Sequence, residues 1–425
     1  MRSSLLMALL LAGCTAPNSG DAADPARREV TLPSPSSWNA SLVLDQQPTG
    51  IWTVKPMQVF EQYACPEVVA LDDLGRCHVL VSYSGKWTPV TTLSDGTWLG
   101  GLCQGDVAPE VPGPELYTGG KRGNLYQVVA HREGVLSSRR IAYLPGLEIH
   151  TLIATDLDRS RPGDELIAFT RPGGLYRLTP PADGLGEFDV ELVEELDGRI
   201  RDAVVLPTAA GSVPELATLS RAGRLALLRW EATGPRWETV FERAMGMGRL
   251  CLAPGSTAER LLLYSTCDDG TVWRHERVDG SWSSELIYAG PQGPRGIAVG
   301  RFHEDPDVES VAVFGYSARV ELLTRGPAGW ELETLFVDRD KGHWLSVAEL
   351  DGRNGTDELV LSGYGARVVL LARPPGYALP GVLTETPDEP DAASPEPGSS
   401  EPEPGSSDPE PSASEPEPSA GAPAP

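Results

Sequence analysis

Two stretches of the sequence, "DELIAFTRPGGLYRLTP" (164–180) and "DELVLSGYGARVVLLAR" (357–373), share one pattern. In each, an acidic step precedes a short apolar run, a turn containing glycine follows, and a second apolar run completes the pair. A third copy, "PELATLSRAGRLALLRW" (214–230), has the same spacing. Apolar runs of this length that are bounded by Gly, Pro and Asp predict β-strands joined by tight turns.

The pattern recurs along most of the chain. Seven units can be written at a spacing of about 45 to 50 residues, which is typical of propeller blades. Several units end in a further strand that opens with tryptophan, as at Trp237, Trp282 and Trp330. A four-stranded unit cannot bury both of its faces alone, so stacking around an axis buries the units against one another. We therefore predict an all-β fold, a seven-bladed β-propeller over residues 37–382.

The seventh unit lacks its fourth strand, because the chain becomes rich in proline after Arg373. The stretch "WNASLVLD" (38–45) matches "WELETLFVD" (330–338) nearly position for position. We predict that residues 38–45 supply the missing outer strand and close the ring, which removes an open sheet edge. The alternative is that residues 38–45 belong to the preceding linker.

The chain begins with the features of an export signal. Arg2 is positive, residues 5–11 form an apolar run too short to span a bilayer, and the run ends in "LAGC" at Cys14. This arrangement resembles the lipobox of bacterial lipoproteins. The resemblance implies a signal peptide over 1–14, lipid on the Cys14 sulfur, and attachment to the cell envelope through that lipid only, with Thr15 favouring the outer membrane. An ordinary secretory signal with a chance cysteine is the alternative.

The two ends of the chain differ in composition from the repeats. Residues 15–36 are polar and predict a flexible linker. Residues 383–425 are rich in Pro, Glu and Ser, which predicts a disordered tail that is either a solvating spacer or an acidic arm for basic partners. The formal net charge of −25 argues against nucleic acid and against adsorption to anionic lipid. We expect the protein to be a monomer.

Five cysteines remain besides Cys14, so at least one thiol stays unpaired within a single chain. Cys65 with Cys77, or Cys251 with Cys267, are local options for disulfides. The expected hairpin register places neither pair opposite, and the pairing is left open. No Cys/His spacing typical of a metal site is present.

An acidic turn lies in "ATDLDRSRPGD" (154–164), where Asp156, Asp158, Ser160 and Asp164 occupy positions one, three, five and nine. This spacing resembles the D-x-D-x-S/D/N-x-x-x-D loop of FG-GAP and VCBS propeller repeats. The resemblance implies a calcium ion held by these oxygen ligands, which suit a hard cation. The alternative is an Asx-turn that joins two strands without an ion.

Cationic residues and histidines recur near the start of the predicted inner strands, at His150, Arg295 and His343, with Arg201 and Arg249 close to the matching place in two more units. Inner strands surround the axis of a propeller, so inward-pointing side chains would form a ring at one opening. In so acidic a protein, such a ring predicts a site for an anion or an acidic sugar. The alternative is that these residues bind the acidic turns of neighbouring blades.

No sequence motif for nucleophilic, zinc-dependent or phosphate-loop chemistry appears. The leading functional hypothesis is an envelope lipoprotein whose propeller is a scaffold for a protein or glycan partner. The alternative is a polysaccharide-acting enzyme of the lyase type, with its chemistry at His150 and His343. That alternative depends on analogy with other propellers.

Overall fold

The computed structural model describes residues 30–373, except 84–85, 112–114, 132–133, 159, 161, 183, 185, 210, 291–292, 304 and 351–354. The predicted signal peptide 1–14 with Cys14, most of the linker 15–36 and the predicted tail 383–425 therefore lie outside the described residues. The described part of the chain contains β-strands and no α-helix, so no helix in it could cross a membrane.

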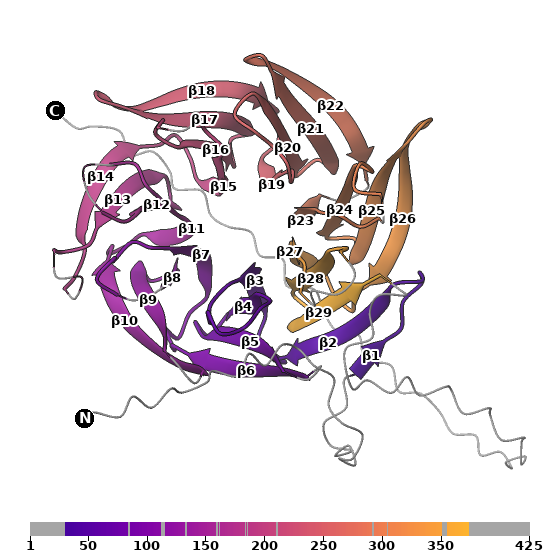
Figure 1. The fold of residues 1–425 in the computed structure, drawn as a ribbon, viewed down its shortest axis with the longest axis horizontal. Coiled ribbons are helices and arrows are strands. Elements are labelled where there is room, and N and C mark those ends of the chain that lie inside the picture. The colour runs from indigo at the N-terminus through magenta and orange to yellow at the C-terminus, as the bar shows by residue number, and fades with distance from the viewer. Residues whose placement is uncertain are drawn as a thin grey trace, which may run out of the picture. The chain divides into compact units, whose positions relative to one another are not determined.

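Seven sheets stand around one axis (Figure 1). Blade 1 holds β3 (Ile51–Met57), β4 (Glu67–Asp72), β5 (Cys77–Tyr83) and β6 (Lys86–Thr92). Blade 2 holds β7 (Leu99–Gly105), β8 (Glu115–Gly120), β9 (Asn124–His131) and β10 (Val135–Tyr143). Blade 3 holds β11 (Glu148–Thr155), β12 (Glu165–Arg171), β13 (Gly174–Thr179) and β14 (Asp189–Glu195).

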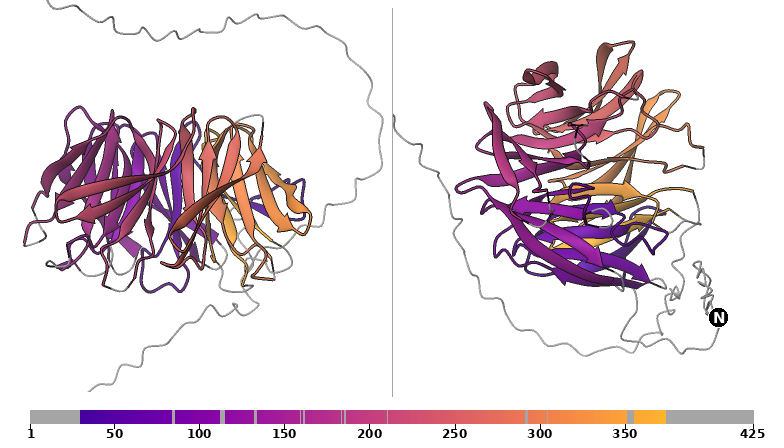
Figure 2. Two further views of the ribbon diagram at one scale, coloured as in Figure 1. Left: turned by 90° about the horizontal axis from the view of Figure 1, so that it is seen from above. Right: turned by 60° about the vertical axis from the view of Figure 1, so that its left-hand side comes forward.

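The remaining blades repeat this arrangement. Blade 4 holds β15 (Ile200–Leu206), β16 (Glu215–Ser220), β17 (Arg224–Glu231) and β18 (Gly234–Glu242). Blade 5 holds β19 (Met247–Leu252), β20 (Arg260–Cys267), β21 (Thr271–Val278) and β22 (Ser281–Ala289). Blade 6 holds β23 (Pro294–Val299), β24 (Ser310–Gly315), β25 (Arg319–Gly326) and β26 (Gly329–Val337). Figure 2 shows these sheets from the side, and the prediction of a seven-bladed all-β propeller is confirmed.

Blade 7 combines the two ends of the described chain. β27 (Gly342–Ala348), β28 (Glu358–Gly363) and β29 (Arg367–Ala372) are followed in the sheet by β2 (Asn39–Asp45), which pairs antiparallel with β29. The predicted closure by an N-terminal strand is confirmed. One difference concerns the predicted linker 15–36. Its last part forms β1 (Val30–Leu32), which pairs with the outer edge of β2 and gives this sheet a fifth strand.

The core lies between neighbouring blades. Every residue of the second strands β4, β8, β16, β24 and β28 is buried, because each of these strands has another blade on both sides. Outer strands such as β6 alternate between partly buried and exposed residues. At the closure, Trp38 is 3% exposed and meets Phe302 of blade 6 edge-on, with ring centroids 6.0 Å apart.

The glutamate of the repeated "PEL/DEL" step has a structural role. In four blades its Oε2 accepts a hydrogen bond from a backbone N–H of the preceding loop, and the four glutamates are buried. The pairs are Glu67 with Val59, Glu115 with Val107, Glu165 with Leu157, and Glu358 with Leu350. The backbone N–H groups of these loops need such acceptors, since a buried N–H without a hydrogen-bond partner lowers the stability of the fold.

Neither local cysteine pair forms a disulfide. Cys77, Cys103, Cys251 and Cys267 have free thiols. Burial raises the pKa of Cys77 and of Cys103 to about 12. Thiols that stay protonated are poor nucleophiles, so these cysteines are packing residues.

Candidate anion-binding mouth

Each inner strand has a β-bulge near its start, and in most blades a residue at the bulge places its side chain in the cavity around the axis. The pairing register with the second strand shifts after the first residue of β3, β7, β15, β23 and β27, and close to the start of β11 and β19. The residues at the shift include Trp52, His150, Arg201, Arg295 and His343. A bulge leaves its extra residue outside the ladder and redirects the side chain. Five blades therefore present large side chains at one opening of the ring.

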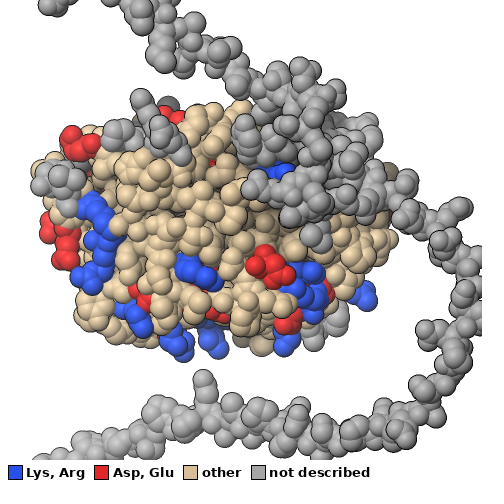
Figure 3. All heavy atoms as spheres, turned by 90° about the horizontal axis from the view of Figure 1, so that it is seen from below, with Lys and Arg blue, Asp and Glu red and all other residues tan. Residues whose placement is uncertain are grey.

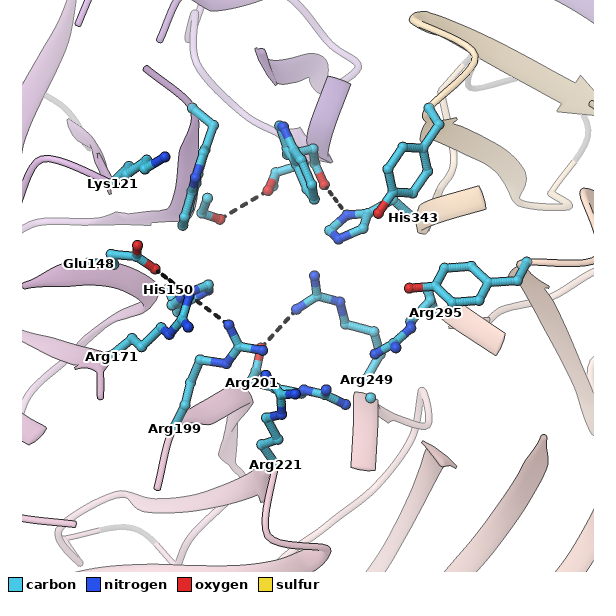
Figure 4. Close-up of a pocket in the computed structure, with 17 residues that line it drawn as sticks. Lys121, Glu148, His150, Arg171, Arg199, Arg201, Arg221, Arg249, Arg295 and His343 are labelled. Carbon is cyan, nitrogen blue, oxygen red and sulfur yellow. Dashed lines mark hydrogen bonds and ion pairs between the residues drawn. The ribbon is translucent and has the colours of Figure 1, made fainter. Parts of the chain in front are cut away.

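The cavity at this opening, which we call the mouth, has a volume of about 420 Å³ and is drawn in Figure 4. Seven basic side chains line it. Four of them, Arg199, Arg201, Arg249 and Arg295, come from the beginnings of inner strands or the residue before them. Of the other three, Lys121 and Arg221 directly follow the second strands β8 and β16, and Arg171 is the last residue of β12. Glu148 is the acidic residue in the same lining.

Aromatic rings form the opposite wall of the mouth. Trp52 and Trp98 lie with their ring centroids 6.1 Å apart, and Tyr364 meets Trp52 edge-on at 5.7 Å. Blade 2 has glycine at its bulge, and a Cβ at Gly100 would lie 2.5 Å from Trp98 Cζ3. The missing side chain leaves the space that the Trp98 ring occupies. Blades 7, 1 and 2 therefore supply most of the aromatic surface, and blades 3 to 6 supply all six guanidinium groups.

The arginines of the mouth are crowded and only partly paired. Arg201 and Arg295 each place a guanidinium nitrogen 2.8 Å from Oδ1 of Asp268, which lies in the turn of blade 5. Arg249 donates to the Arg201 carbonyl at 2.8 Å and lies over the Trp344 ring at 4.0 Å. The alternative that these cations bind a neighbouring acidic turn thus holds for two of them.

Two buried donors in the mouth have no hydrogen-bond partner among the described residues. They are the Nε atoms of Arg199 and Arg295. Buried polar groups in native proteins are almost always paired, so each orphan needs an explanation. Both belong to guanidinium groups of the same cavity, and an anionic ligand there would supply acceptors.

Burial and mutual repulsion shift the ionisation of these groups. Burial, and then the nearby Arg249, lowers the pKa of His343 to about 3, while burial and Arg199 lower the pKa of His150 to about 3. Burial lowers the pKa of Arg199 and of Arg249 to about 10. At neutral pH the two histidines are uncharged and the arginines remain cationic. An anion in the mouth would relieve the repulsion between the guanidinium groups.

The structure brings the predicted residues His150, Arg201, Arg295 and His343 together in the mouth. Their role in ligand binding stays a prediction. Sequence reasoning missed the aromatic wall and the three cations at the ends of the second strands, Lys121, Arg171 and Arg221. The sequence does contain a signal for these cations. One position of the repeat, just after the apolar run of the second strand, holds Lys121, Arg171, Arg221, Tyr316 and Tyr364.

The predicted calcium loop lies at the far end of β11 from the mouth, in the turn between β11 and β12. Ser160 Oγ donates to Asp158 Oδ1 at 2.6 Å, and Asp164 Oδ2 accepts from the backbone N–H of Asp106 at 3.2 Å. Among the described residues, no group of three or more His, Cys, Asp or Glu side chains is placed to hold a metal ion. Calcium binding at Asp156, Asp158, Ser160 and Asp164 stays a prediction.

The outer surface differs from the mouth in its charge pattern. On the face drawn in Figure 3, basic and acidic side chains are interspersed. Many are paired, such as Arg177 with Glu191 at 2.6 Å and Arg236 with Glu231 at 3.1 Å. The concentration of positive charge in the mouth of a chain with net charge −25 is therefore local.

Comparisons with known proteins support the fold. The WD40 β-propeller domain of Doa1 superposes with a TM-score of 0.54 and 11% identity, covering 79% of this chain and 97% of that one. The β-propeller domain of Myceliophteria thermophila Cps50 (Swd1) gives a TM-score of 0.54 and 10% identity, covering 78% and 99%. No family model and no curated protein matches the sequence. At these identities the likeness shows a seven-bladed propeller and nothing about the ligand.

Proposed function

We propose that the protein is a lipid-anchored binding protein of the bacterial cell envelope whose propeller binds an acidic glycan in the mouth. The observation that supports the proposal most is the convergence of seven basic side chains on one cavity, with Glu148 as the acidic residue in its lining. In a chain with net charge −25, this convergence matches an anionic ligand.

Two features favour a sugar over a protein partner. The cavity of about 420 Å³ has the size of a small-molecule site, so it would hold one or two sugar residues. Its aromatic wall at Trp52 and Trp98 offers flat apolar surface for a pyranose ring, while Arg249 and Arg199 face it with charge. A carboxylate-bearing sugar uses both walls, because its ring is partly apolar and its acid group forms bidentate bonds with guanidinium.

The anchoring part of the proposal depends on the N-terminal sequence. The positive residue Arg2, the short apolar run and "LAGC" up to Cys14 support export and lipidation. A glycan of the envelope would then be within reach of the tethered propeller.

The test is equilibrium binding of the full-length protein to polygalacturonate, alginate and neutral dextran. We expect the two carboxylated polymers to bind and dextran not to bind. Arg249→Met removes the guanidinium that lies over Trp344 and keeps an unbranched apolar side chain at this position. We expect it to weaken polymer binding roughly 10- to 100-fold, the effect of losing one charge-assisted contact. Arg236→Met is the matched control, because Arg236 is on the exposed strand β18 and pairs with Glu231.

Three results would count against the proposal. The first is no binding of either carboxylated polymer. The second is equal weakening by Arg249→Met and Arg236→Met, which would indicate diffuse charge attraction. The third is retention of an envelope protein, but of no glycan, in a pull-down that requires Arg249.

A further inference from the structure

The two histidines of the mouth have different free ring nitrogens. His150 Nε2 lies 3.1 Å from a terminal nitrogen of Arg199. A guanidinium can only donate, so the lone pair of His150 Nε2 is already used. His343 Nδ1 lies 2.7 Å from the main-chain carbonyl oxygen of Trp52. A carbonyl can only accept, so His343 carries its proton on Nδ1 and has its lone pair on Nε2.

His343 Nε2 has the properties of a general base. No hydrogen bond to this atom is found among the described residues, and Figure 4 draws the ring at the cavity, near Arg249. Burial and the neighbouring guanidinium groups keep the imidazole uncharged at neutral pH. The Trp52 ring meets His343 edge-on at 4.6 Å and holds its orientation. With its pKa near 3 the empty site holds a weak base, but a bound carboxylate would offset the guanidinium charges and raise that pKa, so the fixed imidazole could then accept a proton from the ligand.

A candidate proton donor lies beside this base. The rings of His343 and Tyr364 have centroids 6.2 Å apart and are nearly perpendicular, at 81°. Burial, and then the neighbouring Tyr316, raises the pKa of Tyr364. Its hydroxyl therefore stays protonated at neutral pH. It is hydrogen-bonded with Tyr316, and donation to a departing oxygen would replace that hydrogen bond.

The guanidinium groups supply the third requirement of an elimination reaction. Arg249 and Arg295 line the same cavity as His343, so a carboxylate held by them would share that cavity with its Nε2. Pairing a carboxylate with guanidinium stabilises the negative charge that develops when the neighbouring carbon loses its proton. Base, acid and carboxylate clamp thus come from blades 5, 6 and 7 of one cavity.

We propose that the mouth cleaves 4-linked uronate polymers by β-elimination. His343 Nε2 removes the proton on C5, the electron pair forms a C4–C5 double bond, and the bond from C4 to the bridging oxygen breaks. Tyr364 gives its hydroxyl proton to that oxygen, and the proton on His343 then restores Tyr364. The products are a shortened chain with a free hydroxyl and a 4,5-unsaturated uronate, with no oxidant, reductant or water consumed. This inference rests on the proposed binding of an acidic glycan.

The experiment follows the ultraviolet absorbance of the conjugated double bond while full-length protein acts on polygalacturonate or alginate. We expect the absorbance to rise with the unaltered chain. We expect His343→Gln and Tyr364→Phe to lower kcat at least about 100-fold, the usual contribution of one acid–base group, and to leave polymer affinity within about threefold. His131→Gln is the control, because His131 is exposed on β9 and bonds Ser137.

The possible outcomes separate the two proposals. Polymer that binds with no rise in absorbance overturns the elimination and leaves glycan binding in place. No binding of either polymer overturns both. A rise in absorbance that persists in His343→Gln overturns the assignment of the base, and thermal melting of each variant checks that a loss does not reflect unfolding.

Discussion

His343 of blade 7 donates a hydrogen bond from Nδ1 to the main-chain oxygen of Trp52 in blade 1, at 2.7 Å. These two residues are the bulged positions of the inner strands on either side of the point where the ring closes. The contact therefore orients a mouth histidine and also joins the last blade to the first. Ring closure and site geometry are coupled at this position.

The closure itself can be tested at Trp38. We expect Trp38→Ala to lower the free energy of unfolding by about 3–5 kcal/mol, because the side chain is 3% exposed and a large cavity would remain. Trp330→Ala is the matched control, since Trp330 opens the equivalent outer strand of blade 6 and is only partly buried. Urea unfolding measures both. Equal losses would contradict a special role for Trp38 in closure.

The buried glutamates of the repeat lead to a second prediction. Glu165 Oε2 accepts from the N–H groups of Leu157 at 2.7 Å and Asp158 at 3.0 Å. Glu165→Ala leaves both donors unpaired, at roughly 1–3 kcal/mol each in unfolding free energy. Glu165→Gln keeps an acceptor oxygen and should lose less. If urea unfolding finds the two variants equally stable, the glutamate does not act through these hydrogen bonds.

The sequence predicts the blades, their number and the closing strand well, because these depend on local signals. Glycine turns, alternating apolar runs and the match between the Trp38 and Trp330 strands are visible without coordinates. The direction of the side chains at the mouth is harder to predict from the sequence, since it depends on a one-residue bulge. An aromatic residue next to a strand, such as Trp98 directly before β7, is ordinarily core, and only the glycine at position 100 lets it line the cavity.

Stability should fall in acid because of a buried histidine. His275 is fully buried between Ser265 and Ser284, and burial lowers its pKa from 6.5 to about 3. The folded state binds fewer protons than the unfolded state between these values. The stabilisation is therefore complete above pH 6.5 and is lost as the pH falls towards 3, at up to ~1.4 kcal/mol per pH unit.

Urea unfolding at pH 7 and pH 5 checks this titration with His275→Gln as the comparison. The variant starts less stable at pH 7, but we expect it to lose less stability than the unaltered chain on acidification. His150 and His343 titrate in the same direction in both proteins, so the difference isolates His275. An identical loss in the two proteins would show that His275 is not responsible.

Lipid attachment at Cys14 makes a prediction that is independent of the propeller. Expressed in a bacterium that processes lipoproteins, the full-length chain should incorporate labelled palmitate and sediment with membranes. Cys14→Ser should do neither, because the proposed attachment atom is the Cys14 sulfur. Cys103→Ser should behave like the unaltered chain, since Cys103 lies in blade 2 with a buried thiol. Palmitate in Cys14→Ser would contradict the lipobox interpretation.

The central claim is that an acidic sugar occupies the mouth, and a crystal structure of the protein with tetragalacturonate tests it most directly. The account predicts a carboxylate within about 3 Å of the Arg249 guanidinium, the hydrogen-bond distance for such pairs, with a sugar ring against Trp52 or Trp98. A tetrasaccharide bound elsewhere on the blades, or an empty mouth at saturating ligand, would contradict it.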